Sequence, residues 1–210
     1  YFDGWDNDAT VMGAGDMEFV AQWLAIEYYV EFYDAEGEII YEDVLFWGNE
    51  IAADVVENPT KEGFEFKYWT VNGNAVELPV TIDASVVTEG SNTIAFEPFF
   101  SIVGYDIIYM VDGKMHKTET YEYGAAITIL ADPVKEGYTF SGWDKTLPAT
   151  MPAEDITVSG TFTVNQYDAL FYVDNNLVAT VPTNFGETPV APDAATAEAV
   201  KPGYTFVKWT

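Results

Sequence analysis

The sequence predicts a β-dominated α+β fold in which consecutive small modules are arranged end to end. Short runs of β-branched and aromatic residues are separated by Gly, Asp and Asn, a pattern typical of β-hairpins. One aromatic motif recurs along the chain, which indicates a repeat protein. Helix-like composition is limited to two runs, 49–57 and 193–199, and each precedes a copy of the motif.

The recurring motif is clearest at residues 137–143, where the sequence reads Gly-Tyr-Thr-Phe-Ser-Gly-Trp. It returns at 203–209, in a looser form at 63–69, and in a truncated form at 1–5. Residues that recur at the same offset in every unit are typical of core positions, so we assign them a structural role. The repeated positions are Gly63, Phe64, Phe66, Trp69, Gly137, Tyr138, Phe140, Trp143, Gly203, Tyr204, Phe206 and Trp209.

A predicted β-hairpin precedes each of the three longer copies of the motif. The strand 27–33 meets 38–41 across an acidic turn, 106–111 turns at Asp112-Gly113, and 169–173 turns at 174–176. Asp, Asn and Gly supply the positive φ values that tight hairpin turns need. Each unit therefore begins with two antiparallel strands.

A proline-rich loop and a final strand follow the motif. In the middle unit the loop is 147–155 and the strand is 156–162. The segment 9–23 aligns with this region without gaps, so that Trp23 corresponds to Phe162. We therefore expect the start of the chain to be the end of a repeat.

These matches divide the chain into four parts. We expect the C-terminal part of a repeat at 1–25, a divergent repeat at 26–100, a complete repeat at 101–164, and the N-terminal part of a repeat at 165–210. A unit of roughly 65 residues folds with a marginal core. Two explanations of the outer parts stay open: the chain is a window from a longer array, or the tail of one chain completes the head of the next by strand addition.

The composition limits the partners. The formal net charge is −27, and the chain has 8 Lys+Arg, all of them lysine, against 35 Asp+Glu. Such a surface repels nucleic acid and the anionic membrane surface, so we expect neither as a partner. There are no cysteines, which excludes disulfides and thiolate sites. No apolar stretch is long enough to span a bilayer, and we expect any export signal to lie outside this stretch or to have been removed.

No set of residues predicts catalysis, so the chain is not expected to be an enzyme. His116 is the only histidine and lies in a predicted strand without evident partners for a triad or a zinc site. We expect no cofactor. Calcium is the one metal with a candidate site, at Asp3, Asp6 and Asp8, because closely spaced oxygen donors suit it. However, Asp6 aligns with Asp144, where no acidic cluster exists, which favours a solvated loop.

Further aromatic residues lie at the ends and junctions of the predicted strands. They either fill cores and junctions or form an exposed platform on which a sugar stacks. The residues concerned are Tyr28, Tyr29, Tyr33, Phe99, Phe100 and Tyr105.

The middle unit resembles the Listeria–Bacteroides repeat, also called the internalin B-repeat. The resemblance rests on the segments 131–144 and 148–157 and on Tyr123-Gly124 before the connector. It implies a small β-grasp-like module from large bacterial surface proteins, with no shared catalytic residues. The unit 26–100 departs from the pattern, because it inserts 71–77 after Trp69 and lacks the Met-Pro-Ala-Glu-Asp string.

Repeats and resemblance together favour a non-enzymatic structural spacer or stalk of a bacterial cell-surface protein. The expected location is extracellular, in a cell-wall-anchored or secreted protein. The expected partners are neighbouring repeats of the same or an identical chain. Two alternatives stay open: an adhesin module that binds host protein or glycan, and a self-assembling extracellular fibre subunit with complementary open ends.

Overall fold

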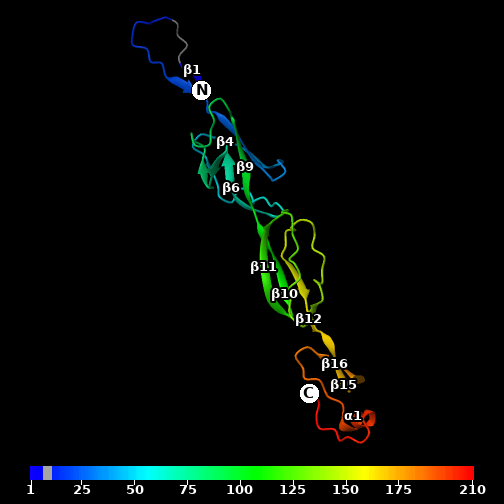
Figure 1. The fold of residues 1–210 in the computed structure, drawn as a ribbon. Helices are drawn as coiled ribbons and strands as arrows, with labels where there is room; N and C mark the ends of the chain where they lie inside the picture. The colour runs from blue at the N-terminus through cyan, green and yellow to red at the C-terminus, as the bar shows by residue number, and fades with distance from the viewer. Residues whose placement is uncertain (7–10) are drawn as a thin grey trace. The chain divides into compact units, whose positions relative to one another are not determined.

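The computed structural model describes residues 1–6 and 11–210. It divides into two compact units, 1–103 and 104–210, and both consist mainly of β-strands (Figure 1). The β-rich class is therefore confirmed. Among the described residues the single helix is α1 (Ala194–Val200), in the second of the two predicted helical runs. No helix in this part of the chain has the length and apolar character needed to cross a bilayer.

The first unit contains a five-stranded sheet in the order β4-β3-β9-β6-β7. Its centre is the parallel pair β3–β9, and the hairpin β3–β4 and the strand β6 flank that pair with antiparallel neighbours. The strands of this unit are β1 (Phe2–Trp5), β2 (Ala21–Trp23), β3 (Glu27–Tyr33), β4 (Ile39–Phe46), β5 (Glu50–Ile51), β6 (Phe64–Val71), β7 (Asn74–Val76), β8 (Val80–Thr81) and β9 (Thr93–Ile102).

The prediction of a helix at 49–57 is wrong. Its first residues form β5, which pairs antiparallel with β8, and turns follow it. Ile51 is almost fully buried in the core of the unit. The burial of this side chain outweighs the weak helical preference of the alanine-rich segment.

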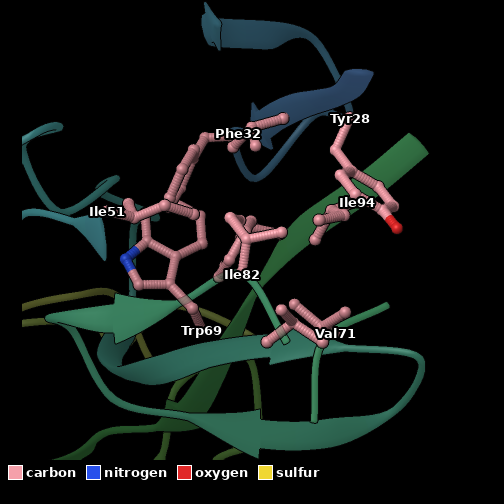
Figure 2. Packing of buried hydrophobic residues seen from close by; sticks show 10 residues of the cluster. Tyr28, Phe32, Ile51, Trp69, Val71, Ile82 and Ile94 are labelled. Carbon is pink, nitrogen blue, oxygen red and sulfur yellow. The ribbon is translucent and has the colours of Figure 1, made fainter. Parts of the chain in front are cut away.

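The core of the first unit follows the period-two pattern of β3. Tyr28, Val30 and Phe32 are buried, because alternate residues of a strand point to the same face. The Phe32 ring stacks on Phe96 with centroids 4.3 Å apart and meets Trp69 edge-on at 4.9 Å. Figure 2 shows Phe32, Trp69 and the other labelled side chains of this cluster pointing toward one another around one apolar core.

The second unit repeats this topology with a shorter sheet. The hairpin β10–β11 comes first, and β13 then pairs parallel to β10, as β9 does to β3. The strand β12 pairs antiparallel with β14. The strands are β10 (Gly104–Val111), β11 (Lys114–Glu122), β12 (Tyr138–Phe140), β13 (Ile156–Gly160), β14 (Phe162–Val164), β15 (Gln166–Val173) and β16 (Asn176–Asn184).

The three predicted hairpins are confirmed as β3–β4, β10–β11 and β15–β16. Asp112 and Gly113 both have positive φ, 50° and 73°, and so do Asp174 and Asn175, at 45° and 69°. These values are those of the tight turns that Asp, Asn and Gly favour. Turn chemistry therefore set the position of each hairpin.

The last part of the chain lacks one element of the complete repeat. Within the described residues, β15 pairs only with β16, whereas β10 lies between β11 and β13. Residues 194–200 form α1 after β16, and the Asp193 carboxylate caps it by accepting hydrogen bonds from the backbone N–H and the hydroxyl of Thr196. In the part of the chain that the structure describes, one edge of β15 is thus without a strand partner.

Candidate functional site: the repeated aromatic turn

The glycine of each motif closes a tight turn. Phe64, Tyr138 and Tyr204 each donate a backbone N–H to the carbonyl of the lysine three residues earlier, at 3.0, 3.1 and 3.4 Å. The glycines between them, Gly63, Gly137 and Gly203, have φ of 76°, 74° and 86°. Only glycine adopts this left-handed conformation without steric cost, which accounts for its return in each copy.

The same turn places a lysine over an aromatic ring. The ammonium of Lys135 lies 3.6 Å from the centroid of the Tyr138 ring. The corresponding distances are 4.7 Å for Lys61 over Phe64 and 4.7 Å for Lys201 over Tyr204. Each is a cation–π contact. The sequence carried the signal for this contact, a lysine two residues before each motif glycine, but the pattern alone did not assign it a role.

The motif tryptophan anchors the core of each unit. In the complete repeat, Trp143 donates its indole N–H to the Leu130 carbonyl at 3.0 Å. Its ring meets Tyr109 and Phe140 edge-on, each at a centroid distance of 5.0 Å. Tyr109 is fully buried, and burial is the main cause that raises the pKa of its phenol above the ordinary value. The aromatic motif therefore sits against the first strand of the repeat.

The last part of the chain repeats that arrangement. Trp209 donates its indole N–H to the Pro192 carbonyl at 3.0 Å and meets Phe171 and Phe206 at 5.1 Å each. In the divergent repeat Trp69 is buried, with Phe66 at 5.3 Å. In the three longer copies the tryptophan and the second aromatic are thus placed in or against an apolar cluster, whereas Phe2 and Trp5 of the truncated copy are exposed.

A carboxylate after the tryptophan ties the motif to the final strand. Asp144 accepts a hydrogen bond from the Ser159 N–H at 2.7 Å, and its own N–H donates to the Ser159 carbonyl at 2.8 Å. Asp6 makes the same two bonds with Val20, both at 2.9 Å. The start of the chain thus reproduces the local structure of the end of the complete repeat.

Of the three aspartates considered for calcium, Asp3 and Asp6 are exposed, and Asp8 lies outside the described residues. Over residues 1–6 and 11–210, no three Asp, Glu or His side chains are grouped closely enough to hold a metal ion. The bonds to Val20 give Asp6 a structural role equivalent to that of Asp144. His116 is exposed on β11.

The six aromatic residues at strand ends divide between core and surface. Tyr28 is buried, Tyr33 is half-buried and donates its hydroxyl to Glu31 at 2.6 Å, and Tyr105 packs against the core of the second unit. By contrast, Tyr29 and Phe99 are 48% and 45% exposed. The Phe99 ring stacks on Tyr68 at 4.8 Å, and Phe100 meets Phe66 at 6.0 Å.

A cavity of about 690 Å³ lies in the last part of the chain. Side chains of β15, α1 and the last motif line it, among them Phe171, Ala197 and Trp209. In the complete repeat the buried Val158 and Met151 complete the cluster around Tyr109, and Tyr109 corresponds to Phe171. The cavity therefore adjoins the position that a final strand takes in the complete repeat.

Among the known proteins similar to this chain are three that match it over part of their own length. Internalin H of Listeria monocytogenes is 39% identical over 116 residues, which is 50% of this chain and 20% of that protein. A putative membrane protein of Evansella cellulosilytica is 26% identical across 99% of this chain and 33% of its own length. A putative Gly-rich membrane protein of the same organism is 26% identical across 95% of this chain and 24% of its own length.

This chain therefore spans only a fifth to a third of the length of these relatives. The sequence profile of the Listeria-Bacteroides repeat domain matches residues 28–94 and 105–165, more than half of the chain. The second match covers the parallel pair of β10 and β13, and the first covers nearly all of β3 and ends at the start of its parallel partner β9. The chain belongs to the Listeria-Bacteroides repeat domain family.

Proposed function

We propose that this chain is a structural spacer, or stalk segment, of a bacterial cell-surface protein, and that its repeats are β-grasp-like modules. The observation that carries the proposal is the placement of the motif. Its tryptophans make the same indole bond and aromatic contacts in successive repeats, at Trp143 and Trp209. The recurring residues thus form the cores of the repeats. Each additional repeat therefore lengthens the protein, which is the role of a spacer.

The net charge of the chain and the names of its relatives support an extracellular location for this protein. A net charge of −27 keeps a repetitive surface soluble by self-repulsion. The relatives include an internalin and two proteins named as membrane proteins. Tandem units that interact mainly with their neighbours also tolerate changes in number, which suits a spacer.

The experiment that tests the spacer places the chain between a cell-wall anchor and an epitope on a bacterial surface. Binding of a large antibody to the epitope is measured for three fusions: the epitope on the anchor alone, behind this chain, and behind a compact globular domain of equal length. We expect the antibody to reach the epitope best behind this chain. Equal binding behind the compact domain would contradict the spacer.

One surface favours a second candidate, an adhesin module for glycan or host protein. On the outer side of the five-stranded sheet, Tyr29 pairs with Val44 across β3 and β4, and both are more than 40% exposed. The stacked pair Tyr68–Phe99 belongs to the same sheet. Saturable binding to a glycan panel that is lost in Tyr29→Ser and kept in Tyr172→Ser, an exposed tyrosine of β15, would establish this function.

The free edge of β15 favours a third candidate, a self-assembling fibre subunit. Residues 17–23 correspond to 156–162, and Phe19 and Trp23 are 42% and 70% exposed. We propose that this tail adds to β15 of another copy as β13 adds to β10. Sedimentation velocity over a range of concentrations tests the idea, because such assembly grows with concentration. A peptide of residues 148–164 should inhibit it by occupying the free edge, and one species at every concentration would exclude it.

A further inference from the structure

Phe185 follows β16 directly and lies on the turn of the preceding repeat. A Cβ atom placed on Gly137 would overlap the Phe185 ring. Gly137 is therefore required for two separate reasons, its φ of 74° and the close approach of an aromatic ring. The first reason applies to the glycine of each turn, and the second involves a residue of the following repeat.

Backbone hydrogen bonds hold this contact in register. Asn165, the residue between β14 and β15, donates its N–H to the Gly137 carbonyl at 2.8 Å. Its own carbonyl accepts the N–H of Phe185 at 2.8 Å. Its side-chain oxygen accepts the hydroxyl of Thr139 at 2.6 Å. One residue thus connects the turn of the repeat 104–164 to the second strand of the next hairpin.

Two further rings border the contact. Phe185 meets Tyr138 edge-on with centroids 6.3 Å apart and meets Tyr167 at 6.5 Å. Edge-to-face pairs in this range are favourable beyond the burial of their area. The contact therefore combines a close-packed glycine, three hydrogen bonds and an aromatic cluster around a single side chain.

The last turn of the chain offers the same surface without a ring on it. Gly203 has nearly the same φ as Gly137, yet among the described residues no heavy atom other than those of its chain neighbours lies within 4 Å of a Cβ placed there. Tyr204 is 68% exposed, whereas the corresponding Tyr138 is half-buried. The difference between the two turns is the aromatic ring that Phe185 supplies.

We propose that the Lys-x-Gly-aromatic turn of a repeat is a docking surface for the aromatic residue that ends the second strand of the repeat that follows. In this chain the Gly137 turn binds Phe185 and locks residues 104–164 and 165–210 into one rigid joint. The inference rests on the proposed spacer function in that a locked joint makes a spacer stiff. The joint itself is a physical claim that is tested without any reference to the cell surface.

The two glycines provide a matched pair of variants. Gly137→Ala and Gly203→Ala introduce the same strain of an alanine at positive φ, but only Gly137→Ala collides with Phe185. Phe185→Ala removes the ring and leaves both turns intact. Because the chain has no cysteine, a Thr118→Cys and Asn176→Cys pair takes spin labels on the two sides of the joint in the full chain.

The distribution of distances between the two labels is the measurement. We expect a narrow distribution in the parent and in Gly203→Ala, and a clearly broader one in Gly137→Ala and Phe185→Ala. Near-ultraviolet circular dichroism checks that the aromatic cores remain folded. A narrow distribution in Phe185→Ala, or equal broadening in the two glycine variants, overturns the joint. If the distance measurements support the joint and the epitope assay shows no advantage for this chain, only the proposed spacer function is contradicted.

Discussion

Tyr109 and Trp143 meet edge-to-face at 5.0 Å, and both bond to the backbone of one residue, Leu130. The Tyr109 hydroxyl accepts the Leu130 N–H at 3.2 Å, and the Trp143 indole donates to the Leu130 carbonyl at 3.0 Å. The connector after the first hairpin is thereby fixed to the core at a point where it has no strand partner. The core of the complete repeat thus depends on polar atoms of its aromatic residues as well as on their rings.

Tyr109→Phe tests this dependence. The change keeps the ring and removes the acceptor of the Leu130 N–H, so we expect the unit to lose about 1 kcal/mol, the lower end of the cost of an unsatisfied donor, because this hydrogen bond is only partly buried. The loss is measured by urea denaturation. The control is Phe171→Tyr at the corresponding position of the last repeat, which adds a hydroxyl instead of removing one. Unchanged stability of Tyr109→Phe would contradict a role for the hydroxyl.

Phe96→Ala should affect only the first unit. Phe96 is fully buried and stacks on Phe32, and removal of such a ring typically costs about 3–5 kcal/mol. Because each unit has its own core, we expect hydrogen exchange to accelerate in 28–102 and to stay unchanged in 104–164. Val134→Ala, at a residue that is 97% exposed, should change neither. Equal acceleration in both segments would show that the units unfold together.

Asp144→Ala should release the end of the aromatic motif from the final strand. The substitution removes the acceptor of the Ser159 N–H, and a hydrogen bond to a charged acceptor contributes about 1.5–3 kcal/mol. Because Asp144 is exposed, we expect the lower end of that range. Faster exchange of the Ser159 amide, compared with the Ile107 amide as an internal reference, is the measurement. An unchanged Ser159 rate would contradict the role given to Asp144 and Asp6.

The helix α1 should weaken in acid. The hydrogen bonds from the Thr196 hydroxyl and N–H lower the pKa of Asp193 below its usual value. A carboxylate with a lowered pKa in the folded state stabilises the fold above its unfolded pKa, near 3.9, and this stabilisation is lost as the pH falls through the folded pKa. The chemical shift of the Thr196 amide, followed from about pH 6 to pH 2, reports the change. Asp193→Ala should remove the transition, and its persistence would assign it to another group.

Turn chemistry and repetition account for most of what the sequence predicted. Asp112-Gly113 fixed a hairpin because those residues favour positive φ, and the motif tryptophans were recognised by their recurrence. The prediction of a helix at 49–57 was wrong because β5 in that segment pairs with β8, which lies about 30 residues further along the chain. Local composition does not reveal such a distant partner. Contacts that need two distant segments were missed for the same reason, including that of Phe185 with Gly137.

The aromatic residues at strand ends show the same limit. Tyr28 and Tyr29 are adjacent and identical in type, yet one is buried and the other exposed. Their difference follows from the register of β3 in the sheet, which the sequence pattern did not assign to one face. The alignment of Asp6 with Asp144 indicated that the two residues have equivalent positions. It did not predict their hydrogen bonds, because no sequence motif identifies a carboxylate that accepts a backbone N–H.

The lysines over the aromatic rings limit how this sequence can drift. The chain has 8 Lys+Arg in total, and Lys61, Lys135 and Lys201 each lie over a motif ring. Exchanges of exposed side chains that make no hydrogen bond or ring contact alter mainly the net charge. A lineage of these repeats can therefore become more acidic at positions without a role in folding while its cation–π turns stay fixed.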